Sequence, residues 1–347
     1  MSARLPITIV GGGLAGLALG LALRQRDVAV TLCEAGSYPR HRVCGEFICG
    51  QGFDLLAELG LREKFLAAGA LEARNVSFHS GARTYPTRNL PYPALCLSRF
   101  VMDDLLAREF RAAGGLLRER ERVKPAALGP GWVRATGRRI EADPSRVKWI
   151  GLKAHARNAS LAADQEMHFV PDGYVGMCRL AGEEVNVCGL FAMRGPVPQL
   201  AVRWPEILRG PEGSVLRKRL QNAEFDPDSF CAVSGLDLTP ASAEPFAECR
   251  IGDALTLIPP VTGNGMSMAF ESARWAVEPL VAYSRGELAW DAARLAVARR
   301  CDAGFARRLR WASTLQNLLL LHPTRAILLA IAHRSEWLWR CFFAKTR

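Results

Sequence analysis

Three glycines near the start of the chain, Gly11, Gly13 and Gly16, have the spacing G-x-G-x-x-G. This spacing suits phosphate binding, because the first glycine permits a sharp turn, the second leaves room for a pyrophosphate against the backbone, and the third lets a helix pack closely on a strand. Glu34 follows at roughly the 20-residue distance expected of an acid that accepts a hydrogen bond from a ribose hydroxyl. These residues predict a dinucleotide site whose adenosine ribose has a free 2′-OH.

The segments around these glycines have the patterns of a strand, a helix and a second strand. Pro6 to Val10 is an apolar run, Leu14 to Gln25 has Ala and Leu at helical spacing, and Val28 to Cys33 is a second apolar run. The helix would start beside the glycines, where free N–H groups and the positive end of its dipole favour phosphates. We therefore predict one βαβ unit.

Composition indicates an ordinary globular protein of 347 residues, with 49% hydrophobic and 23% charged residues. The net charge of +11 is compatible with nucleic acid, an anionic membrane or an acidic substrate. No block interleaves lysines with aromatic residues, so solvated arginine-rich helices are favoured and no nucleic-acid partner is expected. The ten cysteines form no C-x-x-C pair, and neither a signal peptide nor a spanning segment is recognisable. We expect a cytoplasmic protein with free thiols and, because its histidines lack ligand spacing, no metal.

Strands and helices are expected at several places between the first unit and residue 248. Ser98 can cap a helix from Arg99 to Ala113. No third strand of the nucleotide-binding sheet is evident, and Trp132 to Ile140 is a possible hairpin. Period-two alternation between Trp149 and Phe191 predicts an antiparallel sheet, and Pro205 to Phe225 is expected to be helical.

A second motif, CRIGDALTLIPPVTGNGMSMAFESARWAVEPL, begins at Cys249. We expect a strand that ends at Gly252-Asp253, a loop through Pro259 to Gly265, and a helix from about Met266. Two glycine-rich or polar sites at strand ends and helix starts can hold one extended ligand. From residue 288 to the end the chain is expected to be helical.

The segments VGGGLAGL, PRHRVCGEF and GDALTLIPPVTGNGMSMAFESA resemble FAD-dependent oxidoreductases of the geranylgeranyl reductase type. These are similar to the group A flavin monooxygenases, which have the para-hydroxybenzoate hydroxylase fold. The resemblance implies an α/β fold with a Rossmann-like FAD-binding domain, an α+β substrate domain built on an antiparallel sheet, and C-terminal helices. The expected boundaries are 1–70, 98–145 and 248–287 for the FAD-binding domain, 71–97 and 146–247 for the substrate domain, and 288–347 for the helices.

The same resemblance implies a set of FAD-binding residues. Gly11, Gly13, Leu14, Ala15, Gly16 and Arg42 would lie at the pyrophosphate, Glu34 and Ala35 at the ribose, and Gly252 and Asp253 at the ribityl chain; Pro260, Gly263, Asn264, Gly265 and Met266 would lie at the pyrimidine edge of the flavin, Cys44 and Gly45 over the isoalloxazine, and Arg99 against the FAD. Arg40 is an alternative phosphate ligand or a surface residue. A helix start at the pyrimidine edge would stabilise negative charge on the reduced flavin.

The sequence departs from the family at one place. IEADPSRVKWIGLKAH passes from Asp143 to Pro144 without the glycine that usually follows. How NAD(P)H, the expected electron donor, is received is therefore left open.

Three side chains are candidates for proton transfer. Cys44 could deliver a proton beside the flavin, with a tolerated small residue as the alternative. His155 and His168 could act as general bases or be hydrogen-bonded structural residues, and His168 shares a strand face with Glu166.

The favoured function is an NAD(P)H-dependent monooxygenase that hydroxylates or epoxidises an apolar, aromatic or polyketide-like small molecule. The alternative is a flavin-dependent C=C reductase of the geranylgeranyl reductase type, and a non-catalytic flavin-binding protein is a third hypothesis. A halogenase is less favoured, because the W-x-W-x-I-P run is missing. The basic amphipathic segment from Leu309 to Phe343 would pack on the protein or contact a membrane.

Overall fold

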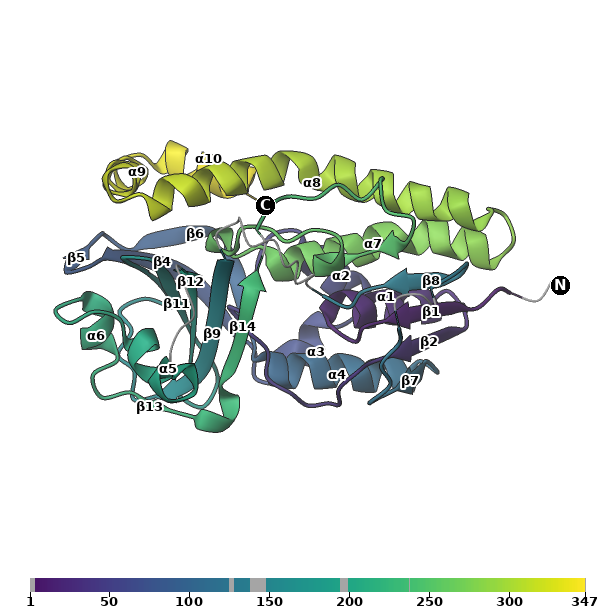
Figure 1. Cartoon of the computed structure of the whole chain (residues 1–347), viewed down its shortest axis with the longest axis horizontal. Helices are drawn as coiled ribbons and strands as arrows, with labels where there is room; N and C mark the ends of the chain where they lie inside the picture. The colour runs from purple at the N-terminus through teal and green to yellow at the C-terminus, as the bar shows by residue number, and fades with distance from the viewer. Residues whose placement is uncertain (1–3, 125–127, 138–147, 194–198, 237, 347) are drawn as a thin grey trace.

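The computed structural model describes residues 4–124, 128–137, 148–193, 199–236 and 238–346. Figure 1 shows two sheet-containing parts side by side, with the C-terminal helices lying over both. The last helix ends above the centre of the molecule. Asp143 and Pro144, where the sequence departs from the family pattern, lie outside the described residues.

The smaller sheet has five strands in the order β15-β8-β1-β2-β7, all parallel. The strands are β1 (Ile7–Val10), β2 (Val30–Cys33), β7 (Leu116–Arg118), β8 (Trp132–Arg134) and β15 (Cys249–Arg250). Helix α1 (Leu14–Arg24) connects β1 to β2 and packs against α4 (Arg99–Ala112) and α7 (Gly265–Ser284). Strands β1 and β2 are almost fully buried, as their continuous apolar sequences require in a parallel sheet.

The larger sheet has ten strands, mostly antiparallel, with one parallel pair between β4 and β10. Its strands are β3 (Phe47–Ile48), β4 (Leu71–Ser80), β5 (Arg83–Thr84), β6 (Arg88–Cys96), β9 (Lys148–Arg157), β10 (Gln165–Val170), β11 (Gly173–Arg179), β12 (Val185–Met193), β13 (Glu224–Phe225) and β14 (Cys231–Leu236). Short β3 comes from the segment expected to belong to the FAD-binding domain, so it ties the two parts together.

Helices cover both faces of the larger sheet. On one face, α5 (Leu200–Arg209) and α6 (Val215–Arg219) pack their buried side chains against β9, β11 and β12. The other face packs against α8 (Trp290–Leu320) and α9 (His322–Arg334), followed by α10 (Glu336–Lys345). In Figure 1, α8 runs along the top of both parts. The remaining helices are α2 (Gly52–Glu58), α3 (Arg62–Ala67) and the 3-10 turns η2 (Pro227–Ser229), η3 (Gly252–Ala254) and η4 (Pro260–Thr262).

Among the described residues, no single helix is long and apolar enough to cross a membrane. Helices α8 and α9 pass that test only when taken together, and the chain bends by 113° between them.

The elements expected from the sequence are largely present. The βαβ unit is confirmed, and so is the cap of α4, where Ser98 Oγ accepts a hydrogen bond from the Phe100 N–H. The prediction of a hairpin from Trp132 is wrong, because β8 pairs in parallel with β1. The third strand of the nucleotide-binding sheet, which was not recognised in the sequence, is β7, which pairs with β2. Both strands have only three residues, too few to show a periodic pattern.

Candidate functional site

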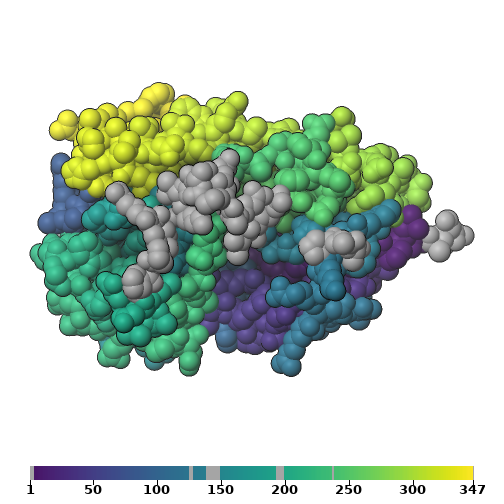
Figure 2. All heavy atoms as spheres, in the orientation of Figure 1, coloured from purple at the N-terminus to yellow at the C-terminus, as the bar shows by residue number. Residues whose placement is uncertain are grey.

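A cavity of about 740 Å³ lies where the two sheets and the start of α7 meet. Figure 2 shows the purple N-terminal part and the teal sheet part side by side below the C-terminal helices. Most residues predicted to bind the cofactor line this cavity: Gly11, Gly13, Leu14, Ala15, Glu34, Ala35, Arg42, Cys44, Gly45, Arg99, Asp253, Pro260, Gly263, Gly265 and Met266. The predicted residues Gly16, Gly252 and Asn264 lie behind this lining. Segments far apart in the sequence are therefore brought to one cavity.

The three N-terminal glycines differ in the space that each would leave for a side chain. A Cβ on Gly11 would lie 2.3 Å from the Ala135 carbonyl oxygen, and one on Gly16 would lie 2.0 Å from the Gly11 carbonyl oxygen. Both close approaches are between backbone segments, so these two glycines are required for packing. A Cβ on Gly13 would meet no atom of the described residues within 4 Å, and Gly13 lines the cavity at the uncapped start of α1. The space over Gly13 is therefore open to a ligand, as the motif predicts for a pyrophosphate.

The carboxylate of Glu34 is nearly saturated by protein donors. It accepts hydrogen bonds from the N–H groups of Gly12 (2.7 Å) and Gly36 (2.8 Å) and from the Arg40 guanidinium (2.6 Å). Burial would raise the pKa of Glu34, but the Gly36 N–H, Arg40 and further donors hold it below its ordinary value. A carboxylate has about four acceptor positions, which leaves one for a ribose hydroxyl. The structure places Arg40 at this carboxylate.

Arg42 and Arg99 flank a buried carboxylate at the edge of the cavity. Arg99 forms a bidentate ion pair with Asp103 (2.7 and 2.8 Å), and the Nε of Arg42 donates to the same carboxylate (2.9 Å). Arg42 Nη2 is buried and makes no hydrogen bond within the described residues, but it lies 3.6 Å from Glu34 Oε2, so this guanidinium stands between the Asp103 and Glu34 carboxylates. Burial alone would lower the pKa of Arg99, but the opposite effects of Asp103 and of the adjacent Cys44 sulfur are larger. The pKa of Arg99 is therefore raised, and Arg99 stays charged.

The loop before α7 is held from two sides. Gly263 has φ +64°, and a Cβ there would lie 2.2 Å from the ring of Phe47, so a side chain would displace that ring. Asn264 is fully buried, and its side-chain amide donates to the Thr346 carbonyl oxygen (2.5 Å) instead of capping α7. The first N–H groups of α7, from Gly265, therefore have no side-chain cap and face the cavity lining. Two uncapped helix starts thus line one cavity.

The larger sheet supplies an apolar wall on the opposite side of the cavity. Its lining residues are Gly151, Tyr174, Cys188, Gly189, Leu190, Cys231, Ala232, Val233 and Leu236. Strand pairing places Leu190 of β12 between Tyr174 of β11 and Gly151 of β9. None of these wall side chains is charged, so this half of the cavity suits an apolar ligand.

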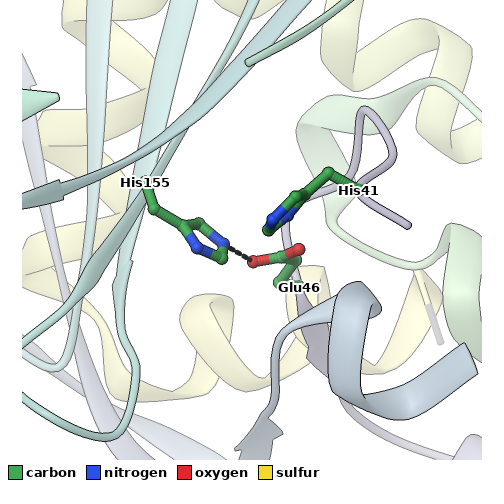
Figure 3. A group of neighbouring side chains, drawn as sticks. All are labelled: His41, Glu46 and His155. Atoms are coloured by element: carbon green, nitrogen blue, oxygen red, sulfur yellow. Dashed lines mark hydrogen bonds and ion pairs between the residues drawn. The ribbon is translucent and has the colours of Figure 1, made fainter. Parts of the chain in front are cut away.

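A buried cluster of charged side chains lies beside this wall (Figure 3). Glu46 is fully buried, and its carboxylate accepts hydrogen bonds from His155 Nε2 (2.7 Å) and the Arg99 N–H (2.9 Å). The ammonium of Lys153, also fully buried, lies 3.3 Å from Glu46 Oε1 and 3.0 Å from His41 Nδ1. Burial would raise the pKa of Glu46, but His155 and then Lys153 hold it below its ordinary value. Glu46 and His41 line the cavity.

The sequence analysis singled out His155 but not its partners. A signal was present for Lys153, because a lysine two residues before a histidine in an apolar strand places two polar groups on one strand face. No comparable signal marked Glu46, which meets β9 only through tertiary contact. His168, in contrast, pairs with Glu166 (2.9 Å) as its strand spacing predicted, away from the cavity lining.

Two groups of His and Glu side chains in the described part of the chain have a geometry that could hold a metal ion: His41, Glu46 and His155, and His79, Glu166 and His168. In each group a protein cation already lies against the carboxylate: Lys153 at 3.3 Å in the first and Arg219 at 3.2 Å in the second. These cations compensate the buried carboxylates, so neither group requires a metal for charge balance.

Comparison with known proteins supports the cofactor suggested by the glycines. Residues 4–153 match the FAD binding domain family. The N-terminal part of the chain is therefore similar to FAD-binding domains. This part contains Gly11 to Gly16, Glu34, Arg42 and the Cys44 loop, all of which reach the cavity lining or pack directly behind it. No curated protein sequence matches the chain.

Solved structures share the fold of the whole chain. The flavin-dependent brominase Bmp2 has a TM-score of 0.73 and 17% identity, over 98% of this chain and 92% of that one. The myxobacterial chondrochloren halogenase CndH has a TM-score of 0.67 and 19% identity, over 89% and 79%. PqsL of P. aeruginosa, solved with 2-aminobenzoylacetate, has a TM-score of 0.67 and 15% identity, over 91% and 95%. The FAD-binding domain thus lies within a fold of the para-hydroxybenzoate hydroxylase type, as the resemblance to group A flavin monooxygenases implied.

Proposed function

We propose that this protein is an FAD-dependent monooxygenase that hydroxylates or epoxidises an apolar small molecule, with NAD(P)H as electron donor. The observation that carries the proposal is the single cavity that joins two uncapped helix starts and the FAD-binding glycines to an uncharged sheet wall. One end suits a dinucleotide, and the other suits an apolar substrate. The 2-aminobenzoylacetate bound by PqsL supports an aromatic substrate class.

The residues present fit FAD. Gly13 leaves the open space that a pyrophosphate needs at the start of α1, and Arg42 lines the same cavity with a positive charge. Glu34 retains about one acceptor position for the ribose. When bound, FAD would supply two-electron redox chemistry and the activation of O₂.

The chain's own residues would position the reaction. The first N–H groups of α7, beginning at Gly265, would stabilise negative charge at the pyrimidine edge by about 0.3–1 kcal/mol. Arg99, held by Asp103, would place a fixed positive charge beside Cys44. The wall formed by β9, β11, β12 and β14 would exclude water from the substrate.

The test begins with purified FAD-loaded protein, NADH or NADPH, isotopically labelled dioxygen, and a panel of aromatic and prenyl compounds. Labelled oxygen in an organic product, with matching loss of the nicotinamide donor, is the expected result. A product that gains two hydrogens would establish the C=C reductase instead, and halogen incorporation with added bromide would establish a halogenase. Donor consumption without any product, or no FAD uptake, would refute the monooxygenase.

Gly13→Val tests the cofactor site directly. The added side chain meets no protein atom near its Cβ, so the variant should fold, but it fills the space over α1 and should abolish FAD retention. Gly129→Val is the matched control, because a Cβ there also meets nothing and Gly129 lies outside the cavity lining. FAD retention by Gly13→Val equal to that of Gly129→Val would show that the pyrophosphate lies elsewhere.

A further inference from the structure

Glu46 adopts a conformation that the fold has to enforce. Its φ of 59° lies in the left-handed region, which is unfavourable for a residue with a side chain. The chain also buries the carboxylate together with the ammonium of Lys153 and the imidazole of His155. Burying ionisable groups gives little net stability even when they are paired, and strained residues gather at functional sites. The cluster therefore calls for a role beyond packing.

The polar atoms of the cluster form one continuous series. His41 Nδ1 lies 3.0 Å from Lys153 Nζ, which lies 3.3 Å from Glu46 Oε1. Glu46 Oε2 accepts from His155 Nε2 at 2.7 Å, and His155 Nδ1 lies 3.5 Å from Glu184 Oε2. Each of these five side chains can bind and release a proton, and each contact is short enough for a hydrogen bond or an ion pair.

The series has one end in the cavity and the other at the surface. His41 and Glu46 line the cavity, whereas the Glu184 side chain is 30% exposed and pairs with exposed Arg157. Figure 3 shows His155 on the sheet, with Glu46 and His41 opposite it on a different segment. The route thus crosses from the FAD-binding domain into the larger sheet.

The charges around the series set the protonation of His41. Burial, then Lys153 and His155, lower the pKa of His41 to about 4, against the opposite effects of Glu46 and Asp226. His41 is therefore neutral at neutral pH. Lysine only donates, so His41 Nδ1 accepts from Lys153 and the ring proton resides on Nε2.

Further titratable groups face the series from the neighbouring elements. Arg99 of α4 donates its backbone N–H to Glu46, and Cys231 of β14 and Arg42 lie near Lys153 and each other. Burial raises the pKa of Cys231, so this thiol stays protonated. These neighbours do not interrupt the contacts within the series.

We propose that His41, Lys153, Glu46, His155 and Glu184 carry a proton from solvent to the FAD cavity. The inference rests on the proposed function, because hydroxylation of RH by O₂ and NAD(P)H yields ROH, H₂O and NAD(P)⁺ only when one proton is taken up. His41 Nε2 releases its proton into the cavity while Nδ1 takes one from Lys153. Lys153 is reprotonated through the Glu46 carboxyl, Glu46 from His155 Nε2, and His155 from the Glu184 end. One proton enters and one leaves, so the net charge of the series is unchanged. The Glu46 carboxyl takes the proton on Oε2 and turns to give it to Lys153, and both imidazoles end with their proton on Nδ1 and must return it to Nε2 before the next transfer.

The test measures proton uptake without any substrate. FAD-loaded protein in weakly buffered, oxygen-free solution is reduced rapidly by the methyl viologen radical cation, whose oxidation neither releases nor takes up a proton, while flavin absorbance and a pH-indicator dye are followed together. In the wild type, uptake should keep pace with reduction. His155→Gln keeps an N–H that can donate to Glu46 but cannot pass a proton on, and should slow uptake by about tenfold or more. Glu184→Gln changes only the exposed end and should slow uptake by a smaller factor.

The matched control is His168→Gln. His168 is also a buried strand histidine that donates from Nε2 to a buried glutamate, and it lies away from the cavity lining. The rate of proton uptake in this variant should equal that of the wild type. His41→Ala removes the end of the series that lies in the cavity and should slow uptake, and added imidazole should restore the rate in that variant. Wild-type uptake rates in both His155→Gln and Glu184→Gln, or equal slowing in His168→Gln, would overturn the proposal. Loss of the monooxygenase reaction alone would not, because the assay needs neither substrate nor O₂.

Discussion

Removing the ammonium of Lys153 should destabilise the protein strongly. Lys153 lies 3.3 Å from Glu46 Oε1, and both side chains are fully buried. Coulomb's law at an effective dielectric of about 20 gives about 5 kcal/mol for unit charges at that distance. Loss of one partner of a buried pair costs about 3–5 kcal/mol, and the remaining His155 contact places Lys153→Met at the lower end. We expect the free energy of unfolding to fall by about 3 kcal/mol.

The double variant Lys153→Met/Glu46→Gln separates this electrostatic effect from lost packing. Because it leaves no uncompensated charge, its destabilisation should be smaller than the sum of the two single losses by about 2 kcal/mol. Urea unfolding at a fixed excess of FAD measures all three variants. Arg26→Met is the control, since Arg26 and Glu278 form an exposed pair (2.7 Å) whose loss should change stability by less than about 1 kcal/mol.

The pH dependence gives a second readout of the same pair. Burial opposes the charge on Glu46, but His155 and Lys153 hold its pKa below the ordinary value. Its stabilising contribution is therefore present above the ordinary pKa and is lost as the pH falls through the lowered one. The difference between wild type and Lys153→Met should narrow over that acidic range. The electrostatic explanation would be refuted by two results together. The destabilisation of the double variant would equal the sum of those of the two single variants, and the stability difference between wild type and Lys153→Met would not vary with pH.

Three further predictions concern other parts of the structure. Gly11→Ala should lower the free energy of unfolding, measured by urea titration, by more than about 2 kcal/mol, because φ is +108° and the new Cβ meets a backbone carbonyl. The same variant should not retain FAD. Burial and then His168 lower the pKa of His79 from 6.5 to about 4. On acidification the unfolded state therefore takes up a proton on His79 before the folded state does, and the free energy of unfolding should fall as the pH falls from 6.5 to about 4. His79→Gln should make the free energy of unfolding less dependent on pH in this range. Asn264→Ala removes the contact with Thr346 and should weaken FAD binding several-fold by fluorescence titration, with little change in far-UV circular dichroism.

Local chemistry made the first βαβ unit predictable. Gly11 and Gly16 are required by backbone approaches of about 2 Å, and the apolar runs on either side have the lengths of the observed elements. The second motif was equally clear, because a strand end and a helix start lie within a few residues of Asp253 and Gly265. In both places the interactions that define the structure are close in sequence.

The Glu46 cluster was not predictable in the same way. Glu46 and His155 come from segments more than a hundred residues apart, and their meeting depends on how the two sheets pack. Strand β7 was missed and β8 was assigned to a hairpin for a related reason: each is stabilised mainly by its neighbours in the sheet. His168 was easier, since its partner Glu166 lies two positions away on the same strand.

The contact between Asn264 and Thr346 has a consequence for biosynthesis. The nascent chain contains the glycines proposed to bind FAD from the start, yet the edge strand β15 (Cys249–Arg250), which pairs with β8, is made more than a hundred residues after β8. The loop before α7 then still lacks the Thr346 carbonyl that holds Asn264, because Thr346 follows 82 positions later. Cofactor loading is therefore expected only after α10 has emerged from the ribosome, and ribosome-stalled chains that expose residues 1–300 should not retain FAD.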